Sequence, residues 1–104
     1  MKRLCIAILL GSMVQGVFAQ KIEIKGTVRS AANSEAVEFV NVVLQTVDST
    51  FVTGVSTNNE GNFNLNKIDA GDYRLVLSSV GYTTQYITLD GIKRNTNLGD
   101  IFLE

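Results

Sequence analysis

Acidic side chains are the main source of reactive groups in this 104-residue chain. After residue 20 there is no histidine or cysteine, which excludes Ser–His and Cys–His nucleophiles and the usual zinc ligands. Two carboxylates could hydrolyse a glycosidic bond if the fold held them roughly 5–10 Å apart. Solvated turn carboxylates are the commoner arrangement, so we predict no catalytic residue. The acidic residues that the pattern places on turns are Asp48, Glu60, Asp69, Asp72, Asp90 and Asp100.

The stretch TNNEGNFNL, residues 57–65, has the polar residues and the glycine of an ion-binding loop. A calcium site needs roughly six to eight oxygen ligands, several of them carboxylates, and this stretch contributes only Glu60. Asn58 and Asn59 tolerate turn dihedral angles, and Gly61 can adopt a positive φ without steric cost. We therefore predict a hairpin turn between adjacent antiparallel strands, with no metal and no cofactor.

Three aromatic residues, Phe51, Tyr82 and Tyr86, are the candidates for contact with a ligand or a protein partner. Aromatic rings are the platforms that carbohydrate-binding β-sandwiches commonly offer. Tyr82 lies at a strand end, where a ring often folds back over the core, and packing is the favoured interpretation for it. For Phe51 and Tyr86 the pattern leaves packing and binding equally open. Phe63 and Tyr73 alternate with leucines and are assigned to the core.

The segments that carry these residues have a hydrophobic period of two, which is typical of β-strands. Alternating segments occur at residues 22–29, 40–45, 50–57, 63–65, 73–78, 83–89 and 99–104. Small and polar residues separate them, notably at residues 30–36, 47–49, 66–72, 79–82 and 90–97. Seven short strands at a spacing of roughly 8–12 residues, without a helical period, predict an all-β sandwich.

Residues 1–19 have the composition of a secretory signal peptide, so the folded domain is predicted to span residues 20–104. Two basic residues precede a short apolar run, LCIAILLGSMV, at residues 4–14. Val17 and Ala19 occupy the small-residue positions before the cleavage site. The run is shorter than the roughly 20 residues that cross a membrane, so we predict export without a transmembrane segment.

The charge of the exported part excludes some partners. Of nine basic residues, two leave with the signal peptide, and the remaining seven face ten acidic residues, a net charge of −3. No basic cluster is present, so nucleic acid is not an expected partner. The only cysteine, Cys5, lies in the signal peptide, so the exported domain is expected to fold without disulfides.

Five segments stand in a characteristic order: KGTVRS at 25–30, AVEFVNVVL at 36–44, GVSTNNEGNFNL at 54–65, AGDYRLVLSSVGY at 70–82 and NLGDIFL at 97–103. Together they resemble the carboxypeptidase regulatory-like domain, a transthyretin-like (prealbumin-like) fold. The most specific parts are the T-x-x-x-G-x-F-x-L and the G-x-Y-x-L…S-x-x-G-Y runs. The resemblance implies a seven-strand antiparallel Greek-key β-sandwich without catalytic residues, because the transthyretin-like hydrolases that use histidines are a separate branch.

When a domain of this family directly follows a signal peptide, the arrangement is similar to the N-terminal extension of Gram-negative outer-membrane β-barrel proteins, including TonB-dependent receptors. The resemblance implies a location at the periplasmic face of the outer membrane and contacts with a plug or barrel portion, through a sheet edge or end loops. The sequence ends just after the last predicted strand, so we expect either a piece of such a receptor or a domain that acts alone. The alternative function is a secreted carbohydrate-binding module that holds a polysaccharide with Phe51, Tyr82 and Tyr86.

Overall fold

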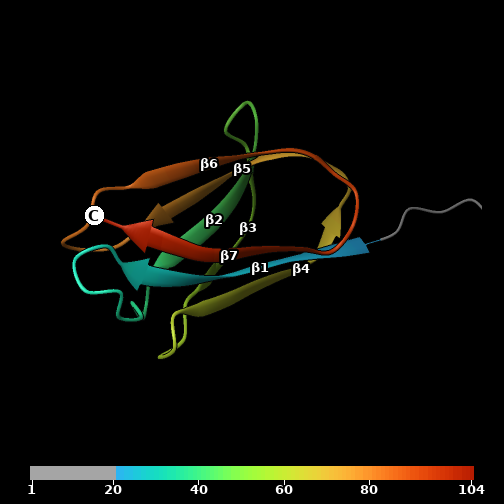
Figure 1. Ribbon diagram of the computed structural model, residues 1–104. Helices are drawn as coiled ribbons and strands as arrows, with labels where there is room; N and C mark the ends of the chain where they lie inside the picture. The colour runs from blue at the N-terminus through green and yellow to red at the C-terminus, as the bar shows by residue number, and fades with distance from the viewer. Residues whose placement is uncertain (1–20) are drawn as a thin grey trace, which may run out of the picture.

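The computed structural model describes residues 21–104, which form two packed β-sheets (Figure 1). The predicted signal peptide lies outside the described residues. Within them no helix occurs that is long and apolar enough to cross a membrane. The prediction of an all-β sandwich is confirmed. Its strands are β1 (Lys21–Ser30), β2 (Asn41–Thr46), β3 (Phe51–Ser56), β4 (Asn62–Asp69), β5 (Gly71–Ser78), β6 (Gln85–Ile92) and β7 (Thr96–Leu103).

One sheet has the strand order β4-β1-β7 and the other the order β3-β2-β5-β6. All neighbours are antiparallel except β1 and β7, which run parallel, so the expectation of a purely antiparallel sandwich needs this correction. The cause is the short connection of residues 93–95 between β6 and β7. β6 ends where Ile92 pairs with Gly71, at the same end of the sandwich as Lys21. β7 therefore enters the other sheet beside the start of β1, as the orange segment in Figure 1 shows.

The core lies between the two sheets and is made of the alternate, inward-facing side chains of each strand. Central strands contribute the most completely buried positions, such as Ile24 in β1, Leu44 in β2 and Leu75 in β5. The full set is Ile22, Ile24, Val28, Val40, Val42, Leu44, Phe63, Leu65, Ile68, Tyr73, Leu75, Leu77, Leu89, Ile101 and Leu103.

All four edge strands contain a β-bulge, whereas the register shows no extra residue in the central strands β1, β2 and β5. Lys67, Gly91 and Gly99 occupy three of the bulges with a positive φ, the conformation of glycine-type bulges. A bulge bends the edge and interrupts its ladder, which opposes pairing with a strand from another molecule. The extra residues lie between Leu65 and Ile68, between Asn97 and Asp100, between Phe51 and Thr53, and between Leu89 and Ile92.

The predicted turn at residues 66–72 is wrong for most of its length, because only Ala70 separates β4 from β5. The bulge at Lys67, with φ of 59°, shifts the alternation by one residue. Ile68 therefore faces the core although it stands three residues after Leu65. A strict period of two assigns Ile68 to the wrong side.

The predicted polar connection at residues 90–97 is also mostly strand. β6 extends to Ile92, and β7 begins at Thr96. The Gly91 N–H, in the bulge of β6, donates to Asp72 Oδ1 at 2.7 Å, so a turn-like residue is held within the sheet. Polar composition alone does not separate a bulged edge strand from a loop.

Candidate functional site

The structure places two of the predicted contact residues, Phe51 and Tyr86, on the solvent-facing side of the four-stranded sheet. Their side chains are 65% and 62% exposed. Cross-strand pairing puts Phe51 beside Gln45 and Gln45 beside Arg74, while Tyr86 lies opposite Val76 on the same face. Because β2 and β5 lie between β3 and β6, the strands that carry the two rings are about 14 Å apart.

Tyr82 does not join these two residues. It is half-buried and packs against the core from the β5–β6 connection. Its N–H donates to Ser79 O at 3.1 Å, which closes the turn after β5. The three predicted contact residues therefore do not form one aromatic cluster.

Arg74 organises the centre of the same sheet face. Its guanidinium lies over the ring of Tyr86, 5.5 Å from the centroid, in cation–π geometry. Its Nε and Nη2 donate to Gln45 Oε1 at 3.4 and 3.2 Å, and Nη2 also donates to the Ser49 hydroxyl. The charged group that could attract a ligand is thus already held by neutral neighbours, and it covers part of Tyr86.

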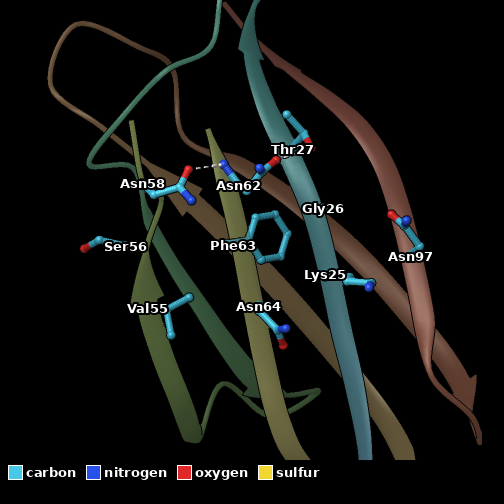
Figure 2. Close-up of a pocket in the computed structure, with 10 residues that line it drawn as sticks. All are labelled: Lys25, Gly26, Thr27, Val55, Ser56, Asn58, Asn62, Phe63, Asn64 and Asn97. Atoms are coloured by element: carbon cyan, nitrogen blue, oxygen red, sulfur yellow. Dashed lines mark hydrogen bonds between the residues drawn. The ribbon is translucent and has the colours of Figure 1, made fainter. Parts of the chain in front are cut away.

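A shallow depression of about 520 Å³ lies beside β4, and Figure 2 shows the Phe63 ring at its centre, facing Gly26. A Cβ atom at Gly26 would come within 2.9 Å of Phe63 Cζ, so glycine makes room for the ring. Several of its polar groups are already paired: Thr27 Oγ1 donates to Asn62 Oδ1 at 2.7 Å. Its lining consists of Lys25, Gly26, Thr27, Val55, Ser56, Asn58, Asn62, Phe63, Asn64 and Asn97.

The stretch at residues 57–65 connects the two sheets. β3 belongs to the four-stranded sheet and β4 to the three-stranded one, so the predicted hairpin between adjacent strands is wrong. It is a turn, however: the N–H groups of Glu60 and Asn62 donate to Asn58 Oδ1, each at 2.9 Å, and Figure 2 draws the second of these bonds. The side-chain oxygen that could have bound a cation is thus used by the backbone. Sequence alone does not indicate which sheet a strand joins.

Thr57, the first residue of this stretch, is buried and fastens the β1–β2 connection. Its hydroxyl donates to Val37 O at 2.8 Å and accepts from the Val40 N–H at 2.9 Å. Its carbonyl accepts from the Phe39 N–H at 3.1 Å. Phe39 is held with φ of 60° and a side chain that is 72% exposed. Sequence reasoning missed both residues, because periodicity marks neither a threonine as buried nor a phenylalanine as exposed.

The prediction that the acidic residues lie on turns holds for Asp48 and Glu60 but is wrong for the other four, which stand in edge or central strands: Asp69, Asp72, Asp90 and Asp100. Several of these carboxylates have structural partners. Asp69 pairs with Lys21 at 2.5 Å, and Asp100 pairs with Arg29 at 3.3 Å. Asp48 accepts from a threonine hydroxyl in its own turn, which holds the pKa of this carboxyl below its usual value. Within residues 21–104 no three acidic side chains gather as a metal site would require.

Comparison with known proteins identifies the fold and one family. The family model of the CarboxypepD_reg-like domain matches residues 24–103. Comparison with curated proteins gives no match. The chain is similar in structure to the Bacillus anthracis TIE protein (13% identity, TM-score 0.66, covering 81% of this chain and 16% of that one). It is also similar to BcpA, the major pilin subunit of Bacillus cereus (14%, 0.68, 79% and 29%), and to the group B streptococcus pilus 2b backbone protein (16%, 0.60, 78% and 40%). It thus spans less than half of each of these proteins, and at such identities the likeness concerns the fold alone.

Proposed function

Because the chain belongs to the carboxypeptidase regulatory-like domain family, a non-catalytic kind of β-sandwich, we propose that it is an interaction domain of an exported protein. In this proposal it stands at the periplasmic face of the outer membrane of a Gram-negative bacterium. It forms the N-terminal part of a TonB-dependent receptor or another β-barrel protein, and its partners are proteins, first of all the plug or barrel portion. The observation that carries the proposal is the family match at residues 24–103 behind the apolar run at residues 4–14.

The inventory of side chains supports contact rather than chemistry as the role of this domain. Residues 21–104 contain no histidine or cysteine. The acidic side chains are spread over separate elements: Asp69 in β4 and Asp100 in β7 are paired with basic residues, and Asp72 in β5 accepts a hydrogen bond from a backbone N–H. What the domain offers to other molecules is its exposed sheet face and its connecting loops.

The size and location of the native product test the proposal. An antibody raised against residues 20–104 is applied to separated periplasmic and outer-membrane fractions of the source cells. We expect a band much larger than the domain, confined to the outer-membrane fraction. A soluble band of the domain's own size would contradict the receptor assignment.

A second candidate, a stand-alone carbohydrate-binding module, is favoured by one observation. Phe51 and Tyr86 are exposed on one sheet face with Arg74 between their strands, an arrangement that could hold a polysaccharide. Glycan-array binding of residues 20–104 tests it, with the Phe51→Ala/Tyr86→Ala double variant as control. Binding that the double variant loses would support this candidate, whereas an array without any bound glycan would count against it.

A further inference from the structure

The end of the sandwich where β1, β5 and β7 finish carries apolar side chains that the core does not use. Phe39 is 72% exposed and Val80 is 99% exposed. Asn41 pairs with Ser78, and Phe39 and Val80 each lie two residues outside this pair, in the connections that enter β2 and leave β5. We call the exposed apolar and acidic side chains at this end the loop-end patch: Phe39, Val80 and the glutamates Glu35, Glu38, Glu60 and Glu104.

The conformation of Phe39 indicates that its exposure is imposed by neighbouring contacts. A bulky side chain is unfavourable at φ of 60°, and glycine or asparagine is the usual residue there. The hydrogen bonds of Thr57 to Val37, Phe39 and Val40 nevertheless hold the backbone in this form. A phenylalanine in this position gains little from the core and is well placed to enter a pocket on another surface.

The charge of the patch points to a basic counterpart. The connections that build it, residues 31–40, 57–61 and 79–84, contain no lysine or arginine. They do contain Glu35, Glu38 and Glu60, which are all exposed. Arg29 of β1 also reaches this end, where it donates to Ser34 O at 3.1 Å, but its charge is paired with Asp100. Two apolar side chains beside the glutamates of these connections are complementary to an apolar pocket edged by lysine or arginine.

The chain end is fastened to the same loops. The Ala31 N–H donates to Leu103 O at 2.8 Å, and the Thr83 N–H donates to Glu104 O at 2.6 Å. Figure 1 shows the C-terminus beside the β1–β2 and β5–β6 connections. Polypeptide that continues from Glu104 therefore leaves the domain next to the loops that hold Phe39 and Val80. Attachment at this point raises the effective concentration of that polypeptide, so a patch far smaller than a free interface of roughly 1,000 Å² suffices.

We infer that the loop-end patch docks onto the portion of the exported protein that follows Glu104, with Phe39 and Val80 entering a basic-edged apolar pocket. This inference rests on the proposed function, which supplies the following portion. Other surfaces are less suited to docking. All four sheet edges are bulged, and the face around Tyr86 is covered in part by Arg74.

Site-specific photo-crosslinking in the full-length exported protein tests the contact directly. A photoreactive amino acid replaces Phe39, Val80 or, as a matched control, Val47. Val47 is also apolar and 64% exposed, but it lies in the β2–β3 turn at the opposite end. We expect cross-links from positions 39 and 80 to peptides that follow Glu104 in the same polypeptide, at least tenfold above those from position 47. Cross-links to a different protein, or equal yields from all three positions, would overturn the inference.

Phe39→Gly allows a second measurement, protease cleavage after Glu104, in a variant that is not expected to unfold. Glycine accepts a positive φ, so residues 20–104 with this change are expected to melt, as an isolated domain, at or above the wild-type temperature. Loss of the Phe39 side chain should release the polypeptide after Glu104 from the domain, so protease cleavage there should become roughly tenfold or more faster. Val47→Ser should leave the cleavage rate unchanged. Unchanged cleavage in Phe39→Gly would overturn the docking. If only a domain-sized product exists, the proposed function fails at the fractionation step, before these measurements begin.

Discussion

The two ends of the sandwich reverse the chain in different ways. At the end where β1 starts, which we call the turn end, Ala70 alone joins β4 to β5, and residues 93–95 join β6 to β7. At the opposite end, the loop end, residues 31–40 join β1 to β2 and residues 79–84 join β5 to β6. The two ends also differ in charge, because the charged residues in the connections of the loop end are all glutamates. The turn end mixes both signs in Lys21, Lys67, Lys93, Arg94, Asp48, Asp69, Asp72 and Asp90.

The contrast shows how each end is held in place. Turn-end connections are short, and the β2–β3 turn is stabilised locally by Asp48, which accepts from the N–H of Thr50 two residues on. The β6–β7 connection is instead held by the distant Glu23, whose N–H donates to Asn95 Oδ1 at 2.9 Å.

The long β1–β2 connection has local bonds, such as that from the Glu35 N–H to Asn33 Oδ1, but the segment that enters β2 is held by Thr57, which is distant in sequence. Gly61, in the same β3–β4 connection as Thr57, accepts a hydrogen bond from the Val28 N–H of β1 at 2.7 Å. A loop that is fixed at a few points leaves its remaining side chains free for contacts outside the domain. The loop end should therefore lose stability when these points are changed.

The largest expected effect is at Gly61. It has φ of 78°, and a Cβ atom there would lie 2.4 Å from Val28 O, so alanine brings both backbone strain and a clash with main chain. We expect Gly61→Ala to lower the free energy of unfolding by about 2–4 kcal/mol, measured by urea denaturation. Gly81→Ala is the matched control, because Gly81 has φ of 90° but nothing within 4 Å of its Cβ position. Equal losses of stability in the two variants would show that the close contact between Gly61 and Val28 of β1 does not contribute to the effect of Gly61→Ala.

Thr57→Val should have the next largest effect. Valine keeps the shape of threonine but leaves the Val40 N–H and one acceptor of Val37 without the hydroxyl. We expect a loss of about 1–3 kcal/mol in urea denaturation, because both groups lie at a buried contact. Thr57→Ser retains the hydroxyl and should lose less. Faster hydrogen exchange of the Phe39 and Val40 amides should accompany the valine change, and unchanged exchange would argue that the loop is fixed elsewhere.

At the turn end, the hydroxyl of Tyr73 should make the stability of the fold depend on pH. Its hydroxyl donates to Asp69 O at 2.6 Å, and burial, with the nearby Asp69 charge, raises the pKa of the phenol above its usual value of 10.0. The protonated form is favoured by folding, so its stabilisation is complete below pH 10 and declines as the pH rises through 10 toward the raised value. Tyr73→Phe should lose about 1 kcal/mol at neutral pH. Its thermal midpoint should also fall less steeply than that of the wild type above pH 10.

Much of the fold could be predicted because burial on one face imposes a period of two. Ile22, Ile24 and Val28, and likewise Leu75 and Leu77, alternate as strands require and lie in the core. The alternation fails at the bulges, and these could not be located, since a bulge depends on how two distant strands are paired. The assignment of β3 and β4 to different sheets was hidden for the same reason.

The candidate contact surfaces could be predicted only in part. Phe51 and Tyr86 were identifiable as aromatic residues of strands, but their shared outer face depends on the register of four strands. Phe39 and Val80 carry no pattern in the sequence. Their exposure follows from loop conformations that long-range hydrogen bonds determine, as Thr57 illustrates.

Each end of the sandwich holds one long side chain at a positive φ, and a change to glycine at these two positions should have a small effect. Lys67, with φ of 59°, forms the bulge of β4 near the turn end, and its side chain is exposed like that of Phe39. Glycine should relieve the backbone at both sites, so we expect Lys67→Gly and Phe39→Gly each to stabilise the isolated domain by about 0.5–1 kcal/mol. Chemical denaturation of the two variants and of the double variant measures this, and the gains should add because the sites lie at opposite ends. A loss of stability in Phe39→Gly alone would mean that the Phe39 ring packs on its own domain, which would remove the argument that it is available to a partner.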